Sequence, residues 1–242
     1  VRDANSDSAG VASSSVVTST ISLTAVNDAP VLGGTLPAPS FTENGTAVVL
    51  DGNLTISDVD DTQMASASVR ITSGFTAGDV LAFVNQSGIS GAYDSATGVL
   101  SLTGAATVAQ YQAALRSVVF SSTSDDPTVN ATATTRGIGW TVTDAGSDAA
   151  AASSVSRNTT LTVVAAQDAP VLSAGGTATY VENAVAQVID GAVTVVSDAD
   201  DTQLSGATIT ISAGYTAGDT LGFAAQNGIT VNDARIEVSP VS

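Results

Sequence analysis

The chain has 242 residues, and its 23 acidic residues against six arginines give a formal net charge of −17. It contains no cysteine and no histidine, which excludes disulfides, thiol catalysis, a Ser-His-Asp triad and imidazole or thiolate metal sites. The scarce, scattered arginines argue against a nucleic-acid partner, because phosphate recognition needs clustered positive charge.

The sequence repeats itself at an offset of 139 to 140 residues. We therefore expect residues 1–25 to be the C-terminal tail of a preceding repeat, 26–165 to be a complete repeat, and 166–242 to be the N-terminal part of a following one. The matching segments are Val26–Leu32 with Ala166–Leu172, Thr42–Asn44 with Val181–Asn183, Ser57–Gln63 with Ser197–Gln203, and Phe75–Asp79 with Tyr215–Asp219.

Within the complete repeat, most of the pattern is typical of β-strands. Apolar and polar residues alternate over 66–72, 137–143 and 159–165, and Gly, Asp, Asn and Ser bound these runs, which predicts half-buried strands. Apolar residues at i, i+3 and i+7 over 108–115 predict a short helix, and a strand resumes at 118–120. Many short strands with one helical turn indicate an all-β sandwich.

Aspartates gather at Asp58, Asp60 and Asp61 and again at their copies Asp198, Asp200 and Asp201. Three carboxylates within four residues repel one another, by about 1 kcal/mol or more for each pair near a surface. A divalent cation removes that repulsion, and calcium accepts six to eight oxygen ligands. Such a run is also typical of a plain turn, but its recurrence in register favours calcium.

Several motifs follow one another along the chain. They are Asn27–Pro30, Glu43–Asn44, Asp58–Asp60, Asp94–Leu102, Val108–Ser122 and Trp140–Asp144. Their order and spacing resemble the cadherin repeat and, more specifically, the cadherin-like tandem repeats of giant bacterial surface adhesins that are exported by type I secretion. The resemblance implies tandem immunoglobulin-like Greek-key sandwiches, with one short helix per repeat and Ca²⁺ bound at the joints between repeats.

The resemblance, together with the acidic clusters, nominates a set of metal ligands. Ala25 and Val26 stand where the family has a linker acid, and Gln167 stands where Asn27 would recur, so one or two ions per joint are expected rather than three. The ligands are expected to be Asn27, Asp28, Glu43, Asp58, Asp60, Asp61, Asp94, Asp168, Glu182, Asp198, Asp200 and Asp201.

Two further acidic sites stay open between a metal-binding interpretation and a plain loop. One comprises Asp144 and Asp148, on an expected hairpin loop, and the other comprises Asp125 and Asp126. Trp140 is expected in the core rather than on a sugar-binding platform, because it alternates with other apolar residues.

The function expected from these features is structural. The chain is interpreted as a calcium-rigidified spacer of a large extracellular adhesin or surface fibre that supports cell adhesion or biofilm formation, with no catalysis and no membrane insertion. Its expected partners are neighbouring repeats, copies of itself, or cell-surface and matrix partners held by other modules. One alternative is a carbohydrate- or cell-surface-binding module. Another is a fibre subunit joined by strand donation, because 11–25 alternates like a strand.

Overall fold

The computed structural model describes residues 1–229. The chain divides into two compact units, of which unit 1 is Val1–Gln167 and unit 2 begins at Asp168. Within the described residues, no helix has the length and apolar character needed to cross a membrane.

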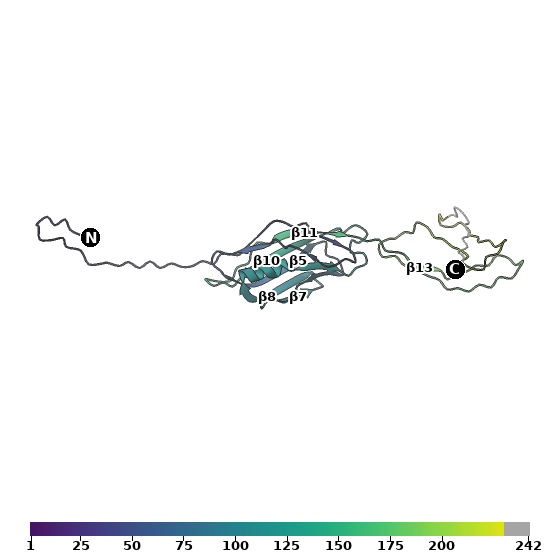
Figure 1. Ribbon diagram of the computed structural model, residues 1–242, viewed down its shortest axis with the longest axis horizontal. Helices are drawn as coiled ribbons and strands as arrows, with labels where there is room; N and C mark the ends of the chain where they lie inside the picture. The colour runs from purple at the N-terminus through teal and green to yellow at the C-terminus, as the bar shows by residue number, and fades with distance from the viewer. Residues whose placement is uncertain (230–242) are drawn as a thin grey trace. The chain divides into compact units, whose positions relative to one another are not determined.

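Unit 1 contains a six-stranded sheet in which neighbouring strands are antiparallel except at one pair. Its order is β2-β11-β10-β5-β8-β7, and Figure 1 shows β11 above β10 and β5, with β8 and β7 below them. The exception is β2 with β11, which run parallel. The strands are β2 (Ser40–Thr42), β11 (Arg157–Val164), β10 (Thr135–Asp144), β5 (Gln63–Ser73), β8 (Val99–Thr107) and β7 (Ser90–Asp94).

Two smaller sheets complete the sandwich. The first has the order β3-β9-β6 and the second pairs β1 with β4. Phe41 of β2 meets Phe120 of β9 edge-to-face, with ring centroids 5.3 Å apart, and both side chains are fully buried. The core therefore lies between the large and small sheets, which confirms the predicted all-β sandwich. The strands are β3 (Val48–Val49), β9 (Val119–Ser122), β6 (Asp79–Ala82), β1 (Val31–Gly33) and β4 (Thr55–Ser57).

The predicted helix is α1 (Val108–Arg116). Thr107 and Gln110 form a capping box at its start, which satisfies backbone N–H groups that the first helical turn leaves free. Tyr111 and Leu115 are buried, as their spacing predicts, and α1 is the one helix of the described residues.

Strand β10 shows how strictly the alternation is kept. Its even-numbered residues are all fully buried, because successive side chains of a strand point to opposite faces. This row has an apolar centre and a charged residue at each end. Its members are Arg136, Ile138, Trp140, Val142 and Asp144.

Strand register defines two ends of unit 1. Asp144 pairs with Met64 at one end, which we call the Asn27 end. At the opposite end, which we call the Glu43 end, the first residue of β10, Thr135, pairs with Thr162 near the C-terminus of β11. The chain reaches the sandwich at the Asn27 end and leaves it at the Glu43 end (Figure 1).

The remaining segments are largely extended. Residues 14–30 form no strand, and Ile21 and Leu23 are 83% and 91% exposed, because an alternating sequence becomes a strand only where a partner strand pairs with it. In unit 2, β12 (Val171–Ser173) pairs with β13 (Thr194–Ser197), which repeats the pairing of β1 with β4. Ile189 is 57% exposed, whereas its counterpart Leu50 is buried.

Candidate metal centre

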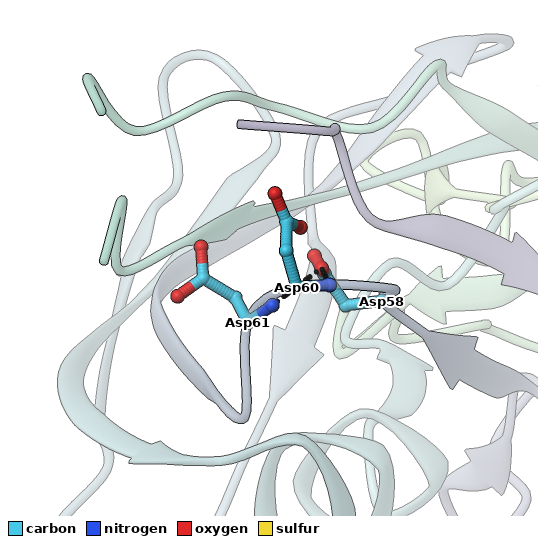
Figure 2. Close-up of side chains that lie close together, drawn as sticks. All are labelled: Asp58, Asp60 and Asp61. Atoms are coloured by element: carbon cyan, nitrogen blue, oxygen red, sulfur yellow. Dashed lines mark hydrogen bonds between the residues drawn. The ribbon is translucent and has the colours of Figure 1, made fainter. Parts of the chain in front are cut away.

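The acidic loop between β4 and β5 is folded around the first aspartate. Oδ1 of Asp58 accepts hydrogen bonds from the backbone N–H of Asp60, at 3.2 Å, and of Asp61, at 2.9 Å. Figure 2 shows the carboxylates of Asp60 and Asp61 on the same side of this loop. One carboxylate oxygen from each of the three residues lies within 4.8 Å of the others, so the loop concentrates negative charge in a small volume.

The linker that precedes β1 is bound to this loop. The N–H of Asp28 donates to Oδ2 of Asp60 at 2.8 Å. The side-chain amide of Asn27 donates to Oδ2 of Asp144 at 3.0 Å. The linker residues predicted as ligands therefore lie beside the aspartate loop, although about 30 positions separate the two in the sequence.

The hairpin loop between β10 and β11 is the third segment of the acidic cluster. Oδ1 of Asp144 accepts hydrogen bonds from the N–H of Gly146 and of Ala152, at 3.0 and 2.9 Å. The N–H of Ser147 donates to Oδ1 of Asp61 at 3.1 Å. Three segments distant in sequence thus meet at the Asn27 end of the sandwich.

Three oxygens of this cluster are buried without a hydrogen-bond partner. They are Oδ1 of Asn27, Oδ2 of Asp58 and Oδ1 of Asp60. An unpaired buried polar atom costs free energy, and a buried charge costs more. A set of donors made only of carboxylate and amide oxygens suits a hard cation such as Ca²⁺ or Mg²⁺, so the residues present fit such an ion.

The two central aspartates differ in proton affinity. Burial is the main cause that raises the pKa of Asp58, and the neighbouring Asp60 carboxyl adds to that effect. The N–H of Asp28 is the main cause that lowers the pKa of Asp60. In the metal-free loop, Asp58 is therefore the carboxyl more easily protonated, and a bound cation would favour its ionised form.

Unit 2 repeats the local geometry. Carboxylate oxygens of Asp198, Asp200 and Asp201 also lie within 4.8 Å of one another. The N–H of Asp201 donates to Oδ1 of Asp198 at 2.9 Å, and the N–H of Asp168 donates to Oδ2 of Asp200 at 3.3 Å. Both hydrogen bonds have direct counterparts in unit 1, so two acidic clusters could each hold a metal ion.

The remaining predicted ligands lie elsewhere. Glu43 is buried at the Glu43 end, where its Oε2 accepts the N–H of Ala166 at 2.9 Å. Asp94 holds the turn between β7 and β8, because its two oxygens accept the N–H of Ala96 and the hydroxyl of Thr97. Glu182 is exposed in unit 2. The twelve nominated residues therefore do not form one group, and the nomination of these three as ligands stays a prediction.

The acidic sites left open by the sequence also have distinct surroundings. Asp144 is fully buried and belongs to the cluster at the Asn27 end, whereas Asp148 is exposed. Oδ2 of Asp126 accepts the N–H of Asn130 within its own loop, at 2.7 Å. The alternation along β10 could have predicted that Asp144 is buried, because Asp144 lies four positions after Trp140 and therefore on the same face of the strand.

Comparison with known proteins gives one partial similarity. No family model matches the chain, and no solved structure matches it. An alignment of 116 positions, which covers 46% of the chain, shows 35% identity to halomucin of Haloquadratum walsbyi. The matched part is only 1% of halomucin, so the chain spans a very small share of that protein's length.

Proposed function

We propose that the chain is a spacer segment of a large extracellular surface protein, in which Ca²⁺ at the joints stiffens a row of β-sandwich repeats. The observation that carries the proposal is the group of three buried, unpartnered oxygens of Asn27, Asp58 and Asp60. They belong to a loop and a linker that hydrogen bonds hold together. An ion bound there would fix the linker to the end of the sandwich.

The partial similarity to halomucin supports this proposal, since it fits a repeat of a large surface protein. Recurrence of the acidic cluster in unit 2 adds support, because a joint site should recur once per repeat. In this proposal the chain is not an enzyme. It holds a distal binding module away from the cell and so serves adhesion or biofilm formation.

Calorimetric titration of CaCl₂ into chelator-treated protein tests the proposal. We expect dissociation constants between micromolar and millimolar, a range whose weaker end, about 0.1 to 1 mM, is that of extracellular calcium modules. The melting temperature should rise, because an ion that binds only the folded state stabilises it by mass action, by about 2.7 kcal/mol at a free concentration of 100 times Kd. Titration with MgCl₂ separates calcium from the other hard cation.

The matched variants are Asp58→Asn with Asp60→Asn, and Asp7→Asn as the control. The first pair should abolish the heat of one site and most of the gain in melting temperature. The control removes a negative charge from an exposed loop and should leave both unchanged. Equal melting curves with calcium and with chelator in the unaltered protein would contradict the proposal.

The two alternatives remain predictions. A carbohydrate-binding module needs exposed aromatic side chains, and in residues 1–167, all of which the structure describes, no aromatic side chain is fully exposed. The described part of unit 2 exposes Tyr180, Tyr215 and Phe223, which are the positions to substitute in a glycan-binding assay. Strand donation would require Ile21 and Leu23 to become buried in assembled fibres, which hydrogen exchange can measure.

A further inference from the structure

The outer face of the large sheet in unit 1 is neutral, although the chain carries a net charge of −17. Strand pairing places outward residues of β7, β8, β5 and β10 in rows across this face. Of the first two rows from the Asn27 end, one holds four Ser or Thr residues and the other holds three and an alanine. The third row is Asp94, Val99, Arg70 and Gly139. We call these three rows the β8 face.

The third row contains the two charges of the β8 face, and they have opposite signs. Val99 pairs with Arg70 on one side and with Asp94 on the other. Neighbouring strands lie about 4.8 Å apart, so about 10 Å separates the two charged residues, and neither forms an ion pair with another residue of 1–167. Ser101 and Thr103, along the centre of the face, are exposed, so no element of unit 1 covers it.

This order of charges is self-complementary in one orientation only. When two identical faces pack by a two-fold axis that lies between them, parallel to β8 and over Val99, the β5 side of each copy faces the β7 side of the other. Arg70 then lies opposite Asp94 of the second copy, on both sides of the axis. An axis that runs across the strands, along the third row, would instead place Arg70 opposite Arg70 of the second copy, and like charges would repel.

We propose that the β8 face is a contact surface between two copies of this chain, which lie side by side and point in the same direction. The common direction follows because rotation about an axis parallel to β8 leaves the direction of the strands unchanged. Elsewhere the excess of acidic residues makes two copies repel, so the neutral face is where a second copy can approach. The proposal goes beyond a spacer stiffened along its length, because it joins neighbouring spacers laterally and requires no ion.

The size of the β8 face predicts a weak contact. Four strands span about 19 Å, and the nine residues of β8 span about 31 Å. Two such faces would together bury roughly 1,200 Å², which is the lower end of the range for stable, specific interfaces. Association is therefore expected only at high protein concentration. The short Ser and Thr side chains favour it, because they lose less conformational entropy on contact than long charged side chains do.

Sedimentation equilibrium of the full chain, at concentrations up to about 1 mM, measures this contact. The average mass should rise from that of a monomer towards twice that value, with CaCl₂ and with chelator alike. Arg70→Asp should weaken association about tenfold or more, because like charges then face each other twice. Arg2→Asp makes the same charge change at an exposed position outside the face and should have no effect. A monomer at every concentration, association that depends on calcium, or association that Arg70→Asp leaves intact would each overturn the proposal.

An exchange of charges tests the pairing of Arg70 with Asp94. Asp94→Arg should also weaken self-association, because each copy then offers two positive charges. An equimolar mixture of Arg70→Asp and Asp94→Arg should recover association, since opposite charges again face each other on both sides of the axis. Two folded variants that stay monomeric when mixed would refute the pairing. Asp94 also holds the turn between β7 and β8, so if Asp94→Arg does not fold, crosslinking decides.

Crosslinking also tests the common direction. The chain contains no cysteine, so a single introduced thiol reacts only with the same thiol of a second copy. Val99→Cys and Thr103→Cys both lie near the axis, and each should give a dimer with a short bifunctional thiol reagent. In the opposite alignment, the two copies of residue 103 would lie about 27 Å apart, and only Val99→Cys would react. Thr160→Cys, three strands from β8, is the control. Dimers from Val99→Cys alone, or equally from Thr160→Cys, would overturn the proposal.

Discussion

Replacement of Arg136 by methionine should destabilise unit 1 more than any exposed substitution. Arg136 is fully buried and contacts Oδ2 of Asp79 at 2.6 Å, and the Asp79 side chain is also fully buried. The guanidinium further donates to the carbonyls of Pro127 and Ala133, at 2.6 and 2.7 Å. Methionine fills a similar volume but donates nothing, so a buried carboxylate and two carbonyls lose their donors.

The loss of one partner from a buried ion pair costs about 3–5 kcal/mol. For a unit of this size, each kcal/mol lowers the melting temperature by about 2–4 °C, so Arg136→Met should lower it by about 6 to 20 °C. The assays are thermal unfolding, which gives the melting temperature, and urea unfolding, which gives the free energy; both follow the fluorescence of Trp140, the one tryptophan of the chain. Arg70→Met, on an exposed position, should stay within about 0.5 kcal/mol.

A double-mutant cycle separates the ion pair from side-chain packing. Asp79→Leu combined with Arg136→Met should recover about 2 kcal/mol relative to the sum of the two single losses, because neither variant then leaves a lone buried charge. A loss below about 1 kcal/mol for Arg136→Met, or strictly additive single losses, would refute the reasoning that this pair is desolvated and coupled.

Three further expectations follow from single contacts. Thr107→Ala removes the cap of α1 and should cost about 1 kcal/mol in urea unfolding, whereas Thr107→Ser should cost little. The Thr97 hydroxyl is the main cause that holds the pKa of Asp94 below its ordinary value; the stability this gives is complete above the unfolded-state pKa, about 4, and is lost as pH falls through the lower folded-state value. Thr97→Val should raise that pKa in an NMR titration, and an unchanged value would contradict this cause. Asp144→Asn should weaken calcium binding in calorimetry, because Asp144 contacts Asn27, whereas Asp7→Asn, at an exposed position, should leave it unchanged. Equal effects of the two variants would remove Asp144 from the site.

The strands and the helix could be predicted because their signals are local. The burial of Trp140 follows from its alternation with Ile138 and Val142, and that of Tyr111 from helical spacing. Both patterns extend over only a few residues, and the structure confirms both. The aspartate loop was likewise visible, since Asp58 and Asp60 are two positions apart.

The partners that complete the site could not be read from spacing. Asp144 reaches Asn27 across 117 positions, and Ser147 reaches Asp61 across 86. Such contacts depend on which strand ends meet at one end of a sandwich, and the pairing of β10 with β5 and β11 decides that. The ion pair of Arg136 with Asp79, 57 positions apart, was missed for the same reason. The alternation along β10 does indicate that Arg136 and Asp144 face the core, where each needs a hydrogen-bond partner.

Since the chain enters unit 1 at one end and leaves at the other, folding stores a long stretch of chain in a short span. β10 has 10 residues, which at about 3.4 Å per residue gives an axial length of about 34 Å. The repeat at 26–165, stretched out at a similar rise, would reach about 480 Å, more than ten times as far. A filament of such repeats would therefore contain chain length that is released only when a repeat unfolds. If one repeat unfolded under a sudden pull, the filament would lengthen, and the tension on its neighbouring repeats would fall before the filament broke.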